Sequence, residues 1–288
     1  EALFNNSYNS QQRVLAQENT RGTIYAGTGE VLAQTVIAED GTSVREYPYK
    51  NIFAHVVGYT DKGKTGIEEL ENYQLIHSDI SDREKLDHEL AGEKNPGNDV
   101  YTTLDTSLQQ AASDALGLYR GAIVVTEVKT GRVLAMVSKP DYDPNKIAEN
   151  WETLSTDKDK AALVNRGTQG LYPPGSTFKI VTALAYIRQN PDSWQNYHYQ
   201  CNGAYINGDN KINCYHGSVH GSVDLMTSFA KSCNASFANI GMSMDREKFG
   251  DTIDSLLFNQ ELSFPLPYNQ TKVTLDKDST DEDVIQTS

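Results

Sequence analysis

The stretch LYPPGSTFKIV at residues 171–181 places a serine directly after Pro-Pro-Gly and before a long apolar run. Such an arrangement is typical of a helix N-terminus, where a serine side chain can cap free backbone N–H groups. Lys179 follows Ser176 at the spacing i, i+3, and such positions share one face of a helix. The lysine amine would then lie beside the serine hydroxyl, as a general base lies beside a nucleophile. The stretch therefore predicts a helix that begins at Ser176.

The spacing Ser-x-x-Lys is weak evidence by itself, because it occurs three times in the chain. The other two copies begin at Ser155, in a charged segment without Gly or Pro, and at Ser228, inside an expected helix. Ser176 alone follows Pro-Pro-Gly and opens a long apolar helix, where the positive end of the helix dipole can face a developing oxyanion. This context favours Ser176 as both helix cap and nucleophile, with Lys179 as the base.

A second motif, Ser232-Cys233-Asn234, lies within residues 222–242, whose apolar residues have helical spacing. Side chains at i and i+2 of a regular helix diverge, so Ser232 and Asn234 can reach one cleft only at a junction between two helices. In that arrangement Ser232 would pass a proton and Asn234 would hold a substrate amide. Cys233 between them is expected to be a small buried apolar residue.

Strand and helix signals alternate in blocks along the chain, which predicts an α+β fold. Residues 121–138 form two β-branched runs joined by Lys129-Thr130-Gly131, a hairpin signal. The preceding stretch, 100–119, predicts a strand and then a helix capped by Asp105. A Gly/Pro/Asn-rich run at 92–99 suggests a boundary between a small mixed domain, residues 1–95, and a second domain, residues 96–288. The acidic stretch 271–285 is expected to be exposed to solvent.

Composition excludes some classes of function. The net charge of −14 argues against nucleic-acid binding, which needs clustered Lys and Arg. The apolar runs are far shorter than the roughly 20 residues that cross a bilayer. No signal-peptide pattern is present, so we expect any signal or anchor to lie outside this sequence.

The motifs YPPGSTFK (172–179) and SCNASF (232–237), in this order, resemble the transpeptidase domain of penicillin-binding proteins. The likeness to class B, monofunctional peptidoglycan transpeptidases extends through residues 98–112, 121–145 and 165–179. Upstream, NNSYNSQQR (5–13), RGTIYAGTGEVLA (21–33), HVVGY (55–59) and TGIEELEN (65–72) resemble the N-terminal pedestal, or dimerisation-type, domain of that class. The resemblance implies a penicillin-binding, serine β-lactamase-like fold, an antiparallel sheet flanked by helices.

The resemblance implies that Ser176 is acylated by D-alanyl-D-alanine stem peptides or by β-lactams, and that the acyl group passes to an amine on a neighbouring strand. Lys179, Ser232 and Asn234 would complete the machinery, with Ser232 and Asn234 also contacting substrate. No cofactor is required. The class also implies an N-terminal membrane anchor outside this sequence, an extracytoplasmic catalytic domain, and partners among cell-wall glycosyltransferases and the proteins of cell division or elongation, which set cell shape.

The sequence departs from the family at the third motif, Lys-Thr/Ser-Gly. Lys64-Thr65-Gly66 and Lys129-Thr130-Gly131 both precede Ser176, whereas the family places this motif on a strand after the second motif. The final residues, DVIQTS, resemble the point just before that strand, so we expect the C-terminal strands to lie beyond Ser288. Two other functions stay open: a penicillin-binding sensor or scaffold without turnover, and a serine β-lactamase or D,D-carboxypeptidase.

The segment between the two motifs, residues 201–221, is rich in metal-binding residue types. Cys201, Asp209, Cys214 and His216 offer the sulfur, nitrogen and oxygen ligands that zinc takes in structural sites. His220 is not favoured as the imidazole ligand. Three alternatives remain for this segment: a zinc site, a Cys201–Cys214 disulfide, and free thiols.

Overall fold

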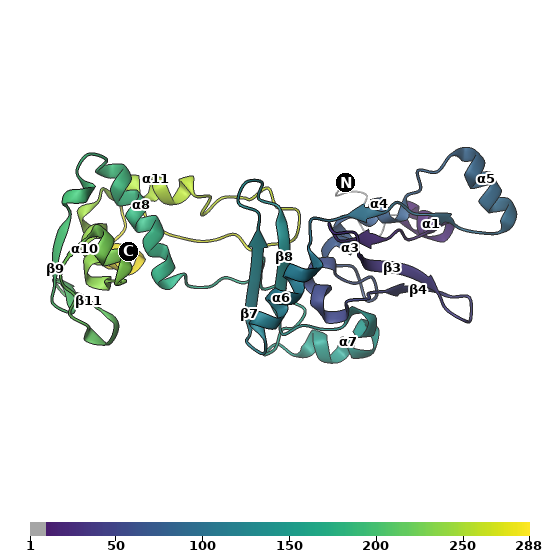
Figure 1. Ribbon diagram of the computed structural model, residues 1–288, viewed down its shortest axis with the longest axis horizontal. Coiled ribbons are helices and arrows are strands. Elements are labelled where there is room, and N and C mark those ends of the chain that lie inside the picture. Colours follow the sequence, from purple (N-terminus) through teal and green to yellow (C-terminus); the bar gives the residue numbers. More distant parts are fainter. Residues whose placement is uncertain (1–9) are drawn as a thin grey trace. The chain divides into compact units, whose positions relative to one another are not determined.

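The computed structural model describes residues 10–288. They form two compact units, and Figure 1 labels the elements of both. The first unit runs up to Gly170 and includes Phe264–Asn269, and the second comprises Leu171–Ser263 and Gln270–Ser288. Each unit mixes helices with strands, which agrees with the predicted α+β class. Nowhere in residues 10–288 is a helix both long enough and apolar enough to cross a membrane.

The first unit consists of short strands and helices. Its elements are α1 (Ser10–Glu18), β1 (Asn19–Thr20), β2 (Ile24–Tyr25), β3 (Val31–Ile37), β4 (Ser43–Glu46), η1 (Lys50–Phe53), α2 (Ala54–Val57), α3 (Gly66–Leu70), α4 (Asn72–Ile76), α5 (Asp82–Ala91), β5 (Asn95–Pro96), β6 (Val100–Tyr101), α6 (Thr106–Leu116), β7 (Gly121–Thr126), β8 (Val133–Lys139), η2 (Pro144–Lys146) and α7 (Ile147–Thr156).

A four-stranded sheet with the order β4-β3-β2-β6 organises the N-terminal part of this unit. Strand β2 pairs antiparallel with β3 and parallel with β6, so residues 21–33 and 98–112 meet at one sheet. The core beneath the sheet is made of buried apolar side chains, among them Ile24, Leu32, Phe53, Val57 and Leu75.

A buried ion cluster joins three segments of the first unit that are distant in sequence. The Glu68 side chain is fully buried and receives the Nε–H groups of Arg21, at 2.6 Å, and Arg45, at 2.7 Å. Arg21 also donates to the Glu68 carbonyl oxygen and to the Asn72 side chain. Because a buried charge is costly unless it is paired and hydrogen-bonded, this cluster fixes the packing of the segments that carry RGTIY and TGIEE.

The predicted hairpin is confirmed as the antiparallel pair β7–β8, with a bulge near its turn. Helix α6, capped by the Asp105 carboxylate as predicted, packs against it (Figure 1). The fully buried Gln109 side chain of α6 accepts from the Met136 N–H of β8 and donates to the Met136 carbonyl oxygen. The Gln109 amide therefore forms the two backbone hydrogen bonds that a neighbouring strand would otherwise form with Met136, and it holds α6 against the hairpin.

The second unit carries the two motifs. Its elements are η3 (Gly175–Phe178), α8 (Lys179–Gln189), η4 (Trp194–Asn196), β9 (His198–Cys201), β10 (Ala204–Asn207), β11 (Asn210–Asn213), η5 (Tyr215–Gly217), β12 (Gly221–Asp224), α9 (Leu225–Ala230), α10 (Asn234–Ser243), α11 (Arg246–Ser255) and α12 (Asp281–Thr287).

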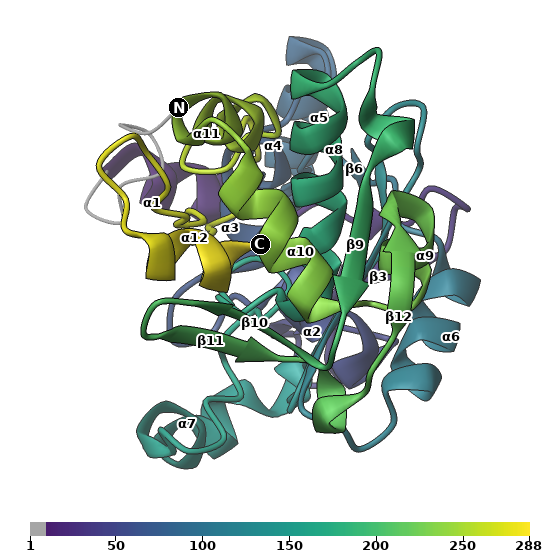
Figure 2. The ribbon, with the colours of Figure 1, turned by 90° about the vertical axis from the view of Figure 1, so that its left-hand side faces the viewer.

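Helices α8 and α10 form the centre of the second unit and pack against each other (Figure 2). Strands β9 and β12 pair antiparallel, and β10 and β11 form a hairpin. The core holds the fully buried rings of Phe237 and Phe249 and, from the acidic C-terminal stretch, Val284. The expectation that residues 271–285 are all exposed is therefore wrong, because α12 packs its apolar side chains on α10.

Candidate active site

Ser176 lies in a 3-10 turn, Gly175–Phe178, that leads directly into helix α8. Gly175 has a φ of +55°, a left-handed conformation that glycine adopts without a steric penalty, and it lets the chain turn sharply after Pro174. The predicted capping role of Ser176 is wrong, since neither helix start has a side-chain cap. The Ser176 hydroxyl is exposed and is therefore available for chemistry.

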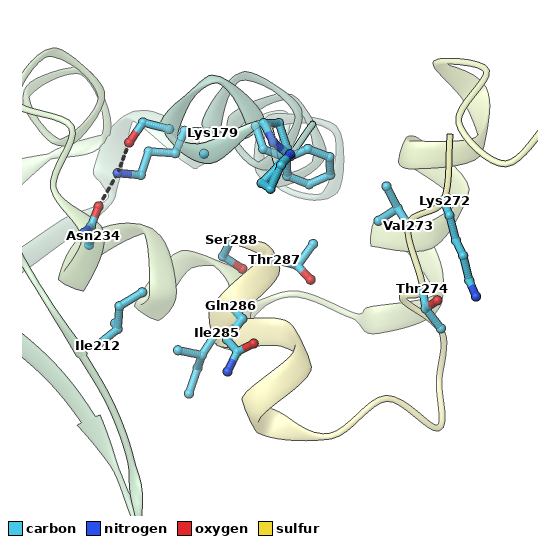
Figure 3. Close-up of a pocket in the computed structure, with 15 residues that line it drawn as sticks. Lys179, Ile212, Asn234, Lys272, Val273, Thr274, Ile285, Gln286, Thr287 and Ser288 are labelled. Atoms are coloured by element: carbon cyan, nitrogen blue, oxygen red, sulfur yellow. Dashed lines mark hydrogen bonds between the residues drawn. The ribbon is translucent and has the colours of Figure 1, made fainter. Parts of the chain in front are cut away.

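The Lys179 amine lies among four oxygen atoms that come from both motifs. Its Nζ is 3.4 Å from the Ser176 hydroxyl and 3.0 Å from the Ser232 hydroxyl. It is also 3.0 Å from the Ser232 carbonyl oxygen. Figure 3 shows its contact with Oδ1 of Asn234, at 2.6 Å. The two hydroxyl oxygens are themselves 3.0 Å apart, so both serines and the lysine form one continuous hydrogen-bonded group.

This environment favours the neutral amine more than water does. The residue is only 6% exposed, and burial lowers the pKa of the Lys179 amine, while the thiols of Cys233 and Cys214 act in the opposite direction. Of its contacts, the Ser232 carbonyl and Asn234 Oδ1 can only accept, so they take two N–H groups of the amine. A neutral amine would then direct its lone pair at the serine hydroxyls.

Ser232 and Asn234 lie at the predicted junction between two helices. Helix α9 ends at Ala230, Cys233 is the N-cap of α10, and its sulfur accepts from the Ser236 N–H. Ser232 adopts a φ of +50°, which is uncommon for a residue other than glycine. This turn makes both side chains point toward Lys179. The Nδ2 group of Asn234 donates to the Asn213 carbonyl oxygen rather than facing open space.

A cavity of about 520 Å³ opens beside this group and lies within the second unit. Ser176, Lys179 and Asn234 line it, together with residues that the sequence did not single out: Lys272, Val273, Thr274 and the last turn of α12, Ile285–Ser288 (Figure 3). Its size suits a small peptide or a drug-sized ligand. No local motif marks Lys272 or Thr274, because only the chain's return to the site brings them there.

The two early Lys-Thr-Gly sequences belong to the first unit. Lys129-Thr130-Gly131 forms the exposed turn after β7, as predicted. Lys64 borders a different cavity, and Gly66 begins the short helix α3. A Cβ at Gly66 would lie 2.6 Å from the Val56 carbonyl oxygen, so close packing accounts for this glycine.

The comparison of the sequence with known families agrees with this geometry. The profile of the penicillin-binding protein transpeptidase domain matches residues 121–288, which is more than half of the chain. The chain belongs to the penicillin-binding protein transpeptidase family. A second profile, that of the penicillin-binding protein A dimerisation domain, matches residues 21–100.

Curated relatives are named peptidoglycan D,D-transpeptidases. The chain is 35% identical over 261 residues to PbpA of Mycolicibacterium smegmatis, which covers 82% of this chain and 52% of the relative. It is 29% identical to MrdA of Acinetobacter baumannii, covering 77% of this chain and 38% of the relative. The chain thus spans about half the length of PbpA, at 52%, and 38% of the length of MrdA.

Solved penicillin-binding proteins share the fold. The D,D-transpeptidase domain of a peptidoglycan glycosyltransferase from Eggerthella lenta matches with a TM-score of 0.77 and 35% identity, over 88% of this chain and 57% of that one. Penicillin-binding protein A of Mycobacterium tuberculosis, solved as an imipenem acyl-enzyme complex, matches with a TM-score of 0.81 and 27% identity, over 94% and 66%. The predicted penicillin-binding fold, with its N-terminal dimerisation-type domain, is confirmed.

The predicted zinc ligands of this penicillin-binding protein are not brought together as a set. Asp209 is exposed at the turn of the β10–β11 hairpin, roughly 10 Å of ladder away from the end that carries Cys214. His216 is exposed and packs its ring on Tyr215 at 4.0 Å between centroids. The assignment of Asp209 and His216 is therefore wrong in geometry, because the hairpin and the following turn direct both away from the cysteines.

A different residue set gathers around the same two cysteines. Within the described residues, Cys201, Cys214, His220 and Cys233 bring their ligand atoms within 4.8 Å of one another. All three cysteines are buried free thiols, and the sulfurs of Cys201 and Cys214 lie 3.7 Å apart rather than at the bond length of about 2.0 Å of a disulfide. His220 lies one residue before Gly221, which pairs with Cys201 in the β9–β12 ladder. This strand register places His220, rather than His216, beside Cys201, and the sequence alone does not specify the register.

Proposed function

We propose that the full-length protein is a serine D,D-transpeptidase that cross-links peptidoglycan through an acyl-Ser176 intermediate and is acylated by β-lactams at the same residue. The observation that carries the proposal is the hydrogen-bonded group formed by Ser176, Lys179 and Ser232 at the wall of a cavity. Penicillin-binding protein A of M. tuberculosis, which has been solved as imipenem and penicillin G acyl-enzyme complexes, supports it as a structural neighbour.

Acylation begins with proton transfer from the Ser176 hydroxyl to the neutral Lys179 amine, either directly or through the Ser232 hydroxyl. The Ser176 oxygen attacks the carbonyl carbon between the two D-alanines, and the carbonyl π electrons move to its oxygen. When the tetrahedral intermediate collapses, the C–N bond breaks and the departing D-alanine takes the proton. An amine from a second stem peptide then attacks the ester carbonyl and forms the new C–N bond. The ester C–O bond to Ser176 breaks, and the proton that the amine loses returns to the Ser176 oxygen through Lys179. No cofactor takes part in these steps.

The second motif would position both Lys179 and the substrate. Asn234 accepts a hydrogen bond from the Lys179 amine and donates one to Asn213, so it joins α8 to β11 through its amide. For Asn234 to hold a substrate amide, its Nδ2 group must exchange the Asn213 carbonyl for the substrate. The backbone N–H of Ser176, at the N-terminal end of the turn that begins α8, would stabilise the oxyanion.

The same proposal assigns the protein's cellular setting. An N-terminal helix outside this sequence would anchor it in the cell membrane, with the catalytic part extracytoplasmic. Residues 1–95, of which 1–9 lie outside the described residues, would form the pedestal or dimerisation-type domain, and 96–288 would belong to the transpeptidase domain. Peptidoglycan stem peptides would be its substrates, and a cell-wall glycosyltransferase or proteins of division or elongation its partners.

Labelling of the full-length protein with fluorescent penicillin tests the proposal. We expect covalent label on the wild-type protein and none on the Ser176→Ala variant, which should keep the wild-type melting temperature because Ser176 is exposed. Thr177→Ala, an exposed neighbour in the same turn, serves as the matched control and should label normally. Label that survives in Ser176→Ala would remove this serine from the mechanism.

The fate of the labelled protein separates the remaining alternatives. A transpeptidase should keep the penicilloyl group for a long time and should join stem peptides when given a D-Ala-D-Ala donor and an amine acceptor. Rapid release of the label by hydrolysis would indicate a β-lactamase, and release of D-alanine without cross-linking would indicate a carboxypeptidase. Stable label with no turnover of stem peptides would indicate a sensor or scaffold.

A further inference from the structure

A second cavity, of about 300 Å³, lies within the first unit. Four cationic side chains line it: Arg21, Arg45, Lys64 and Lys94. Among the described residues that line it, Asp61 is the one carboxylate. The whole chain carries a net charge of −14, so a cavity lined mainly by cations runs against its composition. Such a local concentration of positive charge indicates a site for an anion.

The guanidinium group of Arg45 is held firmly but is not fully paired. Its side chain is only 8% exposed, and its Nε and Nη1 groups donate to the Glu68 carboxylate and the Gly22 carbonyl oxygen, both at 2.7 Å. Within residues 10–288, its Nη2 group is buried and has no hydrogen-bond partner. A buried donor without an acceptor is costly, and a bound ion or water molecule is a usual explanation. Because Arg45 lines the cavity, an oxyanion held there can supply the missing acceptor.

Lys64 adds a further positive charge close to the arginines. Its ammonium group forms no hydrogen bond or ion pair with any of the described residues. Lys64 is exposed, yet desolvation lowers the pKa of its amine, and the nearby charge of Arg21 lowers it further, while Glu68 and Glu69 act in the opposite direction. Like charges held close together cost free energy, and an anion bound between them would offset that cost.

Lys94 and two hydroxyl groups extend the set of donors around the cavity. The Lys94 amine donates to the Ala16 carbonyl oxygen in the last turn of α1, at 3.4 Å. An ammonium group has three N–H bonds, so two remain for a ligand. Ser43 and Thr60 also line the cavity. A ligand there would therefore meet donors from three separate segments of the chain, 43–45, 60–64 and 94.

We propose that this cavity of the first unit binds a phosphate group. Near neutral pH a phosphate ester carries a charge of about −1.5 to −2 and three acceptor oxygens that point in different directions. A carboxylate has one charge and two oxygens in one plane, so it would leave part of this donor set unused. Arginine and lysine both bind phosphate in proteins, the first through its N–H fork and the second as a point charge. A soluble phosphate ester and a phospholipid headgroup present the same chemistry.

The phosphate site gives a role to the early Lys64-Thr65-Gly66 sequence. Close packing against the Val56 carbonyl oxygen accounts for Gly66, but packing does not account for Lys64, which is exposed and unpaired among the described residues. The site is separate from the transpeptidase chemistry, because all the residues that line it belong to the first unit.

Calorimetric titration of the full-length protein with glycerol phosphate, in chloride buffer, tests the site. We expect saturable binding of one ligand per chain, and Lys64→Gln should weaken it by about 10-fold or more, because a charge-assisted hydrogen bond is lost. Lys62→Gln is the matched control: it removes the same charge from an exposed lysine of the same loop that does not line the cavity, and it should change the affinity by less than about twofold. Absence of saturable binding, or equal weakening in both variants, would overturn the proposal.

A variant from a different segment tests whether the donors converge on one ligand. Lys94→Gln should also weaken binding, although Lys94 lies 30 positions from Lys64 in the sequence. Glycerol phosphate should raise the melting temperature of the wild-type protein and have a smaller effect on both variants, because a ligand stabilises only the state that binds it. Wild-type affinity in Lys94→Gln would contradict a site built from these segments.

The choice of ligand distinguishes phosphate from carboxylate and separates the two sources of phosphate. Acetate that binds as tightly as glycerol phosphate would overturn the assignment to phosphate. Tighter, Lys64-dependent binding of dihexanoyl phosphatidylglycerol, below its micelle concentration, would identify a phospholipid headgroup, and tighter binding of glycerol phosphate would identify a soluble ester. Ser176→Ala should bind the preferred ligand as the wild type does, so this proposal and the transpeptidase proposal fail separately.

Discussion

Each unit of the protein contains cationic side chains with little exposure next to a motif of the family. The two units differ in whether a carboxylate balances the positive charge. In the first unit, Arg21 and Arg45 share the carboxylate of Glu68, whose side chain is fully buried. In the second unit, the Lys179 amine forms hydrogen bonds with neutral oxygens and lies 5.4 Å from the centre of the Phe237 ring, and the described residues place no carboxylate within ion-pair distance of it.

The difference distinguishes charges that stabilise the fold, in the first unit, from a charge that can take part in a reaction, in the second. Burial lowers the pKa of the Arg21 guanidinium, and the Glu68 carboxylate acts in the opposite direction. Because an arginine does not lose its proton in proteins, this cluster stays an ion pair that holds segments together. A lysine that is buried without an anion loses part of the stabilisation of its charged form, and its pKa falls. Under the proposed function, the second arrangement costs stability but supplies the base that takes the Ser176 proton.

The largest effect is expected from removing the reactive cation. Lys179→Met should slow penicillin acylation by about 10²- to 10⁴-fold, because no base then takes the Ser176 proton. Lys179→Arg should fail as well, since a guanidinium does not lose its proton. Stopped-flow labelling measures the rate, and circular dichroism checks the fold. Wild-type acylation in either variant would show that Lys179 is not the base.

Removal of the carboxylate from the Arg21–Glu68–Arg45 cluster should lower the stability of the protein and not the acylation rate. Glu68→Ala leaves two buried arginines without a counter-charge and should lower the free energy of unfolding by about 3–5 kcal/mol. The exposed Glu89→Ala in α5 is the matched control and should stay within about 0.5 kcal/mol of the wild type. Urea unfolding measures both. A Glu68→Ala protein as stable as the wild type would contradict the role assigned to the cluster.

The pH dependence of acylation sharpens the comparison. Because burial lowers the pKa of Lys179 from 10.5, the neutral base appears at a lower pH than in a free lysine. Below that pKa the rate should rise about tenfold per pH unit, and it should level off before pH 10.5 is reached. A rate that falls as the pH rises through this range would require Lys179 to act as an ammonium.

The smallest effect is expected at a decoy copy of the Ser-x-x-Lys spacing. Ser155 lies near the end of α7, is exposed, and donates its hydroxyl proton to the Glu152 carbonyl oxygen of its own helix. Ser155→Ala should change neither the acylation rate nor, beyond about 0.5 kcal/mol, the stability. Loss of label in this variant would show that the Pro-Pro-Gly context does not identify the nucleophile among the three copies of the spacing.

What the sequence determined about this protein was local. The Ser176–Lys179 pair, the Asp105 cap and the β7–β8 hairpin each depend on residues close together in the chain, so helix and turn geometry settles them. The junction at Ser232 was predictable for the same reason, since two side chains at i and i+2 cannot share a target from a regular helix.

Tertiary structure alone decided which distant side chains meet. The strand register that sets His220 beside Cys201 and leaves His216 exposed, and the packing of α12 on α10, depend on pairings between segments that no local pattern specifies. Ser176 illustrates both levels. The local sequence places Lys179 beside it. The turn begins at Gly175, so Ser176 does not cap the helix. The tertiary fold brings the Ser232 hydroxyl to 3.0 Å from the Ser176 hydroxyl.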